Sequence, residues 1–245
     1  MQACLLARRG FTAPLAALDG KFGLLEVFGG ASTRPQALDE DAGERFAVAA
    51  WTKVYPFCGG LHAMAQALET LRTRHAIGPQ SVKHVRVGVK ASSLKTHAEV
   101  APKETMAAQY SMPFAAALAL VGDPRDPRAF IGEALNDPAV CALARRVELH
   151  HDPRMEGKEY PSIVGGAHVE LELDDGRKFE SEMWNAHGMP TKPCSEEQIR
   201  KKFRSVAGEC ISDASAADVA ALVGRIETLP SVAPLSDALR GGLRA

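Results

Sequence analysis

The sequence predicts an α+β fold in which helices pack on a mainly antiparallel sheet. Four segments have the residue pattern of strands: 85–89, 147–149, 167–173 and 179–183. Asp174-Asp175-Gly176 lies between the last two, and Asp-Gly between alternating runs predicts a hairpin of antiparallel strands. Apolar residues recur at helical spacing over 61–71 and 199–206, which predicts helices there.

Helix start signals place further helices along the chain. Ser111-Met112-Pro113, Asp126-Pro127 and Asp137-Pro138 each put a capping side chain before a proline in the first turn. Ser195 and Gln198 form a capping-box pattern. Near the start of the chain, Pro14 followed by apolar residues at helical spacing predicts a helix over 14–25.

Composition and charge exclude several classes of protein. Of 245 residues, 46% are hydrophobic, so the chain is not of the disordered class. The 29 Lys and Arg residues balance the 30 Asp and Glu residues, which argues against a nucleic-acid binder. No run approaches the roughly 20 apolar residues of a membrane span. Arg8 and Arg9 follow a short apolar run, unlike a signal peptide, so we expect a cytoplasmic protein with no membrane partner.

The sequence predicts neither a metal site nor a cofactor site. The five cysteines are widely spaced and form no C-x-x-C pair, so we expect free thiols. His150-His151-Asp152 resembles a ligand cluster, but adjacent strand residues point to opposite faces. Glycine-rich phosphate and dinucleotide fingerprints are absent from the sequence.

The segment from Lys53 to His62 is the most informative for function. Lys53 comes before a turn, and His62 lies in the first turn of the helix that follows Gly59-Gly60. Free N–H groups at a helix start attract anions and disfavour a protonated imidazole. We expect Lys53 and a neutral His62 to form a catalytic pocket for a carboxylate, although a solvated Lys53 and a locally bonded His62 also fit this spacing.

Two further segments offer hydrogen-bonding side chains. Gln109-Tyr110-Ser111 precedes a helix start, where Ser111 could bind a ligand or only cap the helix. His187-Gly188-Met189-Pro190 is a sharp turn that either aims an imidazole into a site or only returns the chain.

Together these segments resemble the MmgE/PrpD family, which includes 2-methylcitrate dehydratase, cis-aconitate decarboxylase and iminodisuccinate epimerase. The matching motifs follow the family's order: 10–14 with 18–23, 53–62, 109–120, and 187–193 with 199–203. Cys58 stands where some members carry a histidine, and Phe114 where some carry a tyrosine.

The resemblance implies a cofactor-free lyase or isomerase that acts on di- or tricarboxylates, usually as a homodimer. Its site lies between a large helical domain and a smaller α+β lid. It implies Lys53 and His62 as catalytic residues. The residues that it implies for substrate binding are Tyr55, Cys58, Gln109, Tyr110, Ser111 and His187.

The resemblance also divides the chain. It implies that residues 1–50 end the helical domain, that 51–190 form the lid, and that 191–245 return to the helical domain. Family members carry a long helical part before the segment that opens this chain, so the match is to their C-terminal half. We therefore expect part of a lyase related to 2-methylcitrate dehydratase, from a truncated reading frame or from a split enzyme with a separate helical subunit. The alternative is a non-catalytic module for ligand binding or dimerisation.

Overall fold

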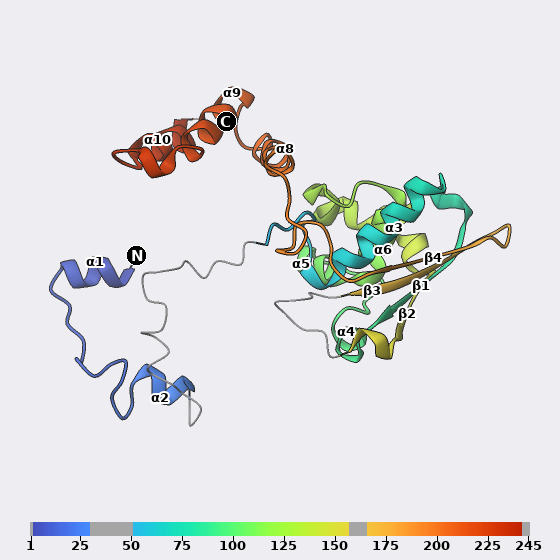
Figure 1. Ribbon diagram of the computed structural model, residues 1–245, viewed down its shortest axis with the longest axis horizontal. Coiled ribbons are helices and arrows are strands. Elements are labelled where there is room, and N and C mark those ends of the chain that lie inside the picture. The colour runs from blue at the N-terminus through green and yellow to red at the C-terminus, as the bar shows by residue number, and fades with distance from the viewer. Residues whose placement is uncertain (1, 30–50, 157–165, 242–245) are drawn as a thin grey trace. The chain divides into compact units, whose positions relative to one another are not determined.

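The computed structural model describes residues 2–29, 51–156 and 166–241 (Figure 1). The chain forms two compact units, Met1–Val48 and Ala49–Ala245. The first unit contains α1 (Gln2–Arg8) and α2 (Leu24–Gly29).

The prediction of a helix over 14–25 is wrong. Turns occupy residues 15–18, and α2 begins only at Leu24. The amide of Leu24 donates to the Ala17 carbonyl at 2.9 Å, a seven-residue closure that an α-helix does not make. Gly20 and Gly23 lie inside this segment, and glycine is a poor helix former.

The second unit contains a four-stranded sheet in the order β2-β1-β3-β4. The strands are β1 (Val82–Val89), β2 (Val147–His151), β3 (Ala167–Leu173) and β4 (Lys178–Met183). Pairs β1–β3 and β3–β4 are antiparallel, as predicted. The Asp-Gly hairpin is confirmed, with Gly176 at φ +86°.

The sheet is mixed, however, because β2 pairs parallel to β1, with Val85 opposite Val147. Parallel neighbours need a long crossover, which the helical segment between β1 and β2 provides. The sheet is therefore mainly antiparallel, as expected, but the sequence did not predict its parallel pair, because alternation of residues along a strand does not reveal the direction of the neighbouring strand.

Several helical segments of this unit begin at the predicted caps. The sheet is accompanied by α3 (His62–Arg74), α4 (Ala91–Thr96), α5 (Thr105–Tyr110), α6 (Met112–Val121) and α7 (Pro138–Ala144). Short 3₁₀ helices are η3 (Gly59–Leu61), η4 (Pro79–Ser81), η5 (Pro127–Phe130), η6 (Gly132–Asn136), η7 (Pro153–Met155) and η8 (Ile226–Thr228). Ser111, Asp126 and Asp137 accept hydrogen bonds from the first turns of their helices.

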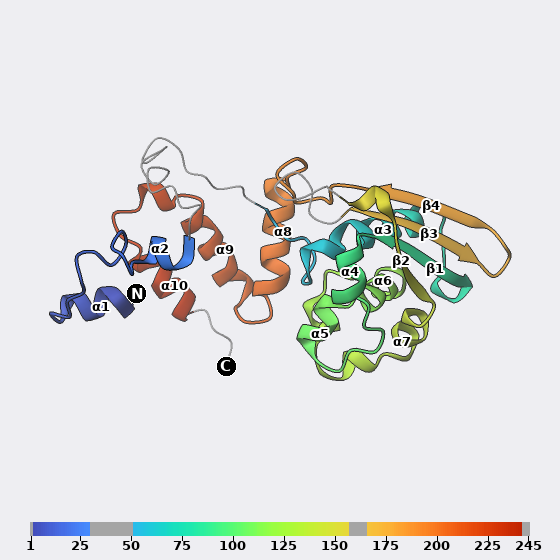
Figure 2. The same ribbon diagram turned by 90° about the horizontal axis from the view of Figure 1, so that it is seen from below.

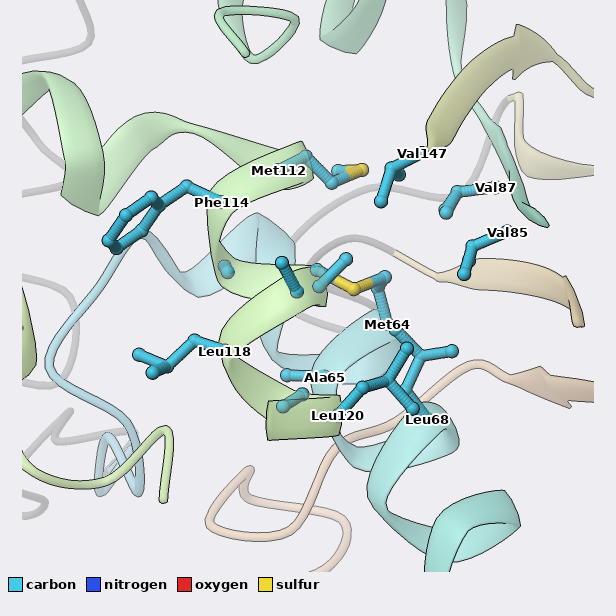
Figure 3. Packing of buried hydrophobic residues seen from close by; sticks show 14 of the residues in the cluster. Met64, Ala65, Leu68, Val85, Val87, Met112, Phe114, Leu118, Leu120 and Val147 are labelled. Atoms are coloured by element: carbon cyan, nitrogen blue, oxygen red, sulfur yellow. The ribbon is translucent and has the colours of Figure 1, made fainter. Parts of the chain in front are cut away.

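The core lies between the sheet and helices α3 and α6. Figure 3 shows Met64 and Leu68 of α3 beside Leu120 of α6, toward the strand residues Val85 and Val87. All five side chains are fully or almost fully buried. Helices α6 and α7 lie side by side (Figure 2). The core therefore fixes the start of α3, where the sequence places its candidate site.

Three helices follow the sheet: α8 (Glu196–Ala207), α9 (Asp213–Val223) and α10 (Ala233–Gly241). The capping box of Ser195 and Gln198 at the start of α8 is confirmed. Across the described residues, helices are too short or too polar to span a bilayer.

Candidate functional site

The turn before α3 is shaped by an aromatic side chain. Cys58 precedes η3, and its carbonyl accepts from the Leu61 amide at 3.0 Å. A β-carbon on Gly59 would overlap the ring of Trp51. Only glycine at this position therefore allows Trp51 to pack directly on the backbone.

His62 is fully buried behind this turn. Its ring has edge contacts with Trp51, Tyr55 and Phe57, at centroid distances of 5.6, 5.0 and 5.3 Å. Its Nε2 lies 3.4 Å from the Phe57 carbonyl, which can only accept, so Nε2 bears the proton of the neutral ring. Nδ1 has no hydrogen-bond partner within the described part of the chain.

The imidazole of His62 is neutral at pH 7, as the sequence predicts. Burial is the largest cause and lowers the pKa of His62 to about 4, and the charges of Lys53 and Lys202 lower it further. The sequence argument assigned this effect to the helix start, whereas desolvation dominates in the structure.

Lys53 lies near a second lysine. The ammonium of Lys202 donates to the carbonyl of Lys53. Burial lowers the pKa of Lys202, and the charge of Lys53 lowers it further. Two cations are therefore concentrated next to the buried imidazole of His62, within range to affect its titration.

A cavity of about 560 Å³ lies between α8 and the segment around Lys53. Thr52 and Val54 line it, whereas Lys53 and His62 do not. Polar side chains of the lining include Gln66, Arg125, His187, Gln198, Lys201 and Lys202. Of the residues predicted from the sequence, His187 is the one that the structure places in this lining.

His187 is fixed in the cavity wall from two directions. Its amide donates to Gln66 Oε1 at 2.8 Å, and its Nε2 lies 2.8 Å from Gln198 Oε1. The neighbouring Gly188 has φ +96°, and its carbonyl accepts from the Thr52 amide at 2.9 Å. The sharp turn therefore joins the end of the sheet to the Lys53 segment and also aims an imidazole into the cavity.

The charge of Arg125 is compensated by its neighbours. Its NH2 nitrogen donates to Glu69 Oε2 at 2.9 Å, and its guanidinium lies 5.0 Å from the centre of the Tyr55 ring. The buried hydroxyl of Tyr55 donates to Glu69, and burial raises the pKa of Tyr55 far above its ordinary value. In the described residues, no carboxylate lies within ion-pair distance of Lys201 or Lys202.

The segment Gln109-Tyr110-Ser111 makes its contacts in two ways. Gln109 and Tyr110 use their backbone carbonyls, and the side chain of Ser111 caps α6. The Gln109 carbonyl accepts from the Cys58 amide at 2.9 Å. The Tyr110 carbonyl accepts from His97 Nδ1 at 3.0 Å. The hydroxyl of Ser111 accepts from the Phe114 amide and donates to the Glu99 carbonyl. The segment thus connects the turn at Cys58 with the end of α4.

Sequence reasoning missed His97. Its Nε2 lies near Gly60, on the side of the turn where Cys58 points. The residue follows a short helix and belongs to no recognisable motif, so the sequence offers no signal for it. Among the described residues, no group of three or more His, Cys, Asp or Glu side chains could hold a metal ion.

Two kinds of comparison with known proteins, with family models and with individual relatives, agree with each other. The family model described as MmgE/PrpD C-terminal domain matches residues 55–228. A cis-aconitate decarboxylase of Aspergillus terreus is 24% identical over 253 residues, covering 96% of this chain and 51% of the relative. A cis-aconitate decarboxylase of Mus musculus is 24% identical over 196 residues, covering 77% of this chain and 39% of the relative. The chain spans about half the length, or less, of these curated relatives.

Proposed function

Because the chain belongs to the MmgE/PrpD family, we propose that it forms part of a cofactor-independent lyase acting on di- or tricarboxylates. In a dehydration or an epimerisation the reaction begins with removal of a proton from a carbon next to a carboxylate, whereas in a decarboxylation CO₂ leaves and the carbon that loses it, or one conjugated to it, takes up a proton. The substrate class is supported by the names of two relatives, whose substrate, cis-aconitate, is a tricarboxylate.

The observation that best supports this proposal is the set of cations beside the cavity. Lys201 and Lys202 line it, and Lys53 lies close enough to lower the pKa of Lys202. Fixed cations in a partly dehydrated site bind carboxylates and stabilise the negative charge that develops when a proton leaves carbon. The cavity volume, about 560 Å³, falls in the usual range for small-molecule sites.

The buried imidazole and the cations have different proposed roles. Lys201 and Lys202 hold a carboxylate of the substrate, and Lys53 adds its positive charge beside the cavity. Lys202 also fixes the backbone of Lys53 by donating to the Lys53 carbonyl. His62 is fully buried among aromatic rings, so its neutral ring supports the segment that presents Lys53. His187 and Gln198 offer hydrogen bonds to a second polar group of the substrate.

The reaction to test first is loss of CO₂ from cis-aconitate, because the relatives bear that name. Dehydration of 2-methylcitrate and epimerisation, which both begin with removal of a proton next to a carboxylate, come next. A second candidate function is ligand binding without turnover, which is favoured by the partial coverage of the relatives.

The experiment is a screen of cis-aconitate, citrate and 2-methylcitrate by NMR of the reaction mixture, with calorimetry for binding. It is run on this chain alone and with a polypeptide that matches the other half of the relatives. Turnover in either sample supports the lyase. Binding without turnover supports the second function, and neither binding nor turnover contradicts both.

Lys53→Ala is expected to lower kcat/KM of the active sample by about 10²-fold or more, because an electrostatic stabiliser of the developing charge is lost. Lys178→Ala is the matched control, since Lys178 is an exposed lysine of β4 that pairs with Glu172. Turnover of Lys53→Ala equal to that of the control variant would exclude Lys53 from the chemistry.

A further inference from the structure

We propose that His97 is a second, substrate-facing imidazole of this site and that its Nε2 accepts and returns the proton of the reaction. This inference rests on the proposed lyase function and names its proton-transfer group. It depends on the tautomer of His97, on the fixed position of its ring, and on the space that the ring borders.

The hydrogen bond to Tyr110 determines the tautomer. Nδ1 of His97 lies 3.0 Å from the Tyr110 carbonyl oxygen, which can only accept a hydrogen bond. Nδ1 therefore carries the proton of the neutral ring, and Nε2 presents a lone pair. Burial lowers the pKa of His97, and the charge of Lys90 lowers it further, so both favour the neutral form of the ring.

The position of the His97 ring is fixed by hydrogen bonds of the His97 backbone and by a stacking contact on the face of the ring. The His97 amide donates to the Ser93 carbonyl at 2.9 Å, and the His97 carbonyl accepts from the Met112 amide at 2.9 Å. The ring stacks on Tyr110 at a centroid distance of 5.8 Å. These contacts join α4 to the start of α6, so the direction of Nε2 is preorganised.

Nε2 of His97 borders a half-exposed space over Gly60, because Cys58, Gly60 and His97 each remain partly accessible to solvent. A β-carbon on Gly60 would lie 3.9 Å from His97 Nε2 and 3.9 Å from Cys58 Sγ, with no closer contact. A thiol and an unprotonated imidazole nitrogen thus face the same space. At the preceding residue, Gly59, the ring of Trp51 covers the backbone. Glycine at position 60 keeps this side of the turn accessible to a ligand.

The backbone carbonyls of two consecutive residues position the two groups that border this space, Cys58 and His97. Gln109 accepts from the amide of Cys58, and Tyr110 accepts from the imidazole of His97. The thiol and the imidazole are therefore positioned by one rigid segment. This gives the Gln109-Tyr110 motif a role in arranging the site through its backbone.

The proposed step balances with no reactant other than the substrate and water. The C–H bond next to a carboxylate breaks, its electron pair remains on the substrate as an enediolate, and the proton goes to Nε2. The resulting imidazolium keeps its Nδ1–H bond to Tyr110 and then returns the proton. The proton goes to the departing hydroxide in a dehydration, or back to carbon in an epimerisation. In a loss of CO₂ no C–H bond breaks: the C–C bond to the carboxylate breaks and its electron pair remains on the substrate. Nε2 of His97 then passes to that carbon a proton that it has taken up from water.

The first test is His97→Gln, which removes the titrating nitrogen and keeps a side chain that can donate to Tyr110. We expect kcat to fall by about 10²-fold or more. We also expect the acidic limb of the pH profile of kcat, which protonation of this ring causes, to disappear. His75→Gln is the control, because His75 packs on Phe179 and should leave both rate and profile unchanged.

Gly60→Ala tests the space itself. The added methyl group meets no atom closer than 3.9 Å, so the variant should fold with an unchanged unfolding temperature. It occupies the space between Cys58 and His97, and we expect kcat/KM to fall tenfold or more. Unchanged kcat/KM in this variant would show that substrate does not enter there.

NMR of ¹⁵N-histidine-labelled chain separates failure of this inference from failure of the proposed function. The free protein should show Nδ1 of His97 protonated, and added citrate should shift the Nε2 signal of His97 but not that of His75. Turnover with full activity and an intact acidic limb in His97→Gln would overturn the inference and leave the lyase standing. Absence of both turnover and a citrate shift would overturn both.

Discussion

At the residue scale, the buried imidazole of His62 couples the site to the stability of the fold. Burial is the main reason that its pKa is lowered to about 4 from the ordinary value of 6.5. Between these two values the unfolded chain binds a proton at this side chain that the folded chain does not bind. The stability contributed by the neutral ring is therefore complete above pH 6.5 and is lost as the pH falls toward 4.

His62→Phe keeps an aromatic ring among Trp51, Tyr55 and Phe57 and removes this titration. We expect the free energy of unfolding of the unaltered protein to fall by up to about 3 kcal/mol more than that of the variant between pH 7 and pH 4. Urea unfolding at a series of pH values measures this difference. His84→Phe, at a half-exposed position on β1, should retain the pH dependence of the unaltered protein. Parallel curves for the protein and His62→Phe would contradict the assignment.

Some residues of the site can be predicted from their neighbours in the sequence, and others cannot. The sequence places His62 in the first turn of a helix and predicts a neutral ring, because the glycine pair and the apolar spacing are local. His97 could not be found in this way, since its role depends on a non-local hydrogen bond to the Tyr110 carbonyl. Its neighbour Cys58 is brought close by another non-local hydrogen bond, from the Cys58 amide to the Gln109 carbonyl. Tyr55 likewise looks available in the sequence, whereas Glu69 and Arg125 occupy its hydroxyl and ring in the fold.

At the element scale, the starts of α6, α7 and α8 were predictable because one side chain caps each of them. The carboxylate of Asp137 accepts from the amides of Ala139 and Val140 at 2.8 and 3.0 Å, and Pro138 occupies the first turn of α7. The spacing of apolar residues was a weaker guide. It suggested a helix over 14–25, where Gly20 and Gly23 favour turns.

Asp137→Ala should lower the free energy of unfolding by about 1 kcal/mol, because two amides at the start of α7 lose their acceptor. Asp137→Asn should recover most of this loss, since an amide oxygen also caps a helix. Chemical denaturation of the three proteins provides the comparison. An equal loss in both variants would show that the charge, and not the capping bond, stabilises α7.

The parallel pairing of β2 shows where element-level prediction stops. Both β1 and β2 have apolar residues suited to a strand. The sequence of neither strand indicates whether the neighbouring strand runs parallel or antiparallel to it. Direction follows from the path of the connection, which here runs through α4 to α7. A connection with four helices is typical of a crossover between parallel strands.

At the scale of the whole molecule, the buried core comes from the second compact unit. Among the described residues, the buried hydrophobic cluster extends from Tyr55 to Leu173, and the candidate site lies at the turn before α3, inside this range. A contiguous segment that contains its own sheet, covering helices and core is expected to fold as a unit.

A polypeptide of residues 49–245 should therefore unfold in a single cooperative transition and retain the Nδ1-protonated tautomer of His97. The physical reason is that the sheet, α3, α6 and Tyr110, which bonds to and stacks on the His97 ring, lie within it. Calorimetry with urea unfolding monitored at two wavelengths tests cooperativity, and ¹⁵N NMR tests the tautomer. The matched control is the full chain under the same conditions. A broad transition, or a fragment that folds with the other tautomer, would show that the site requires residues 1–48.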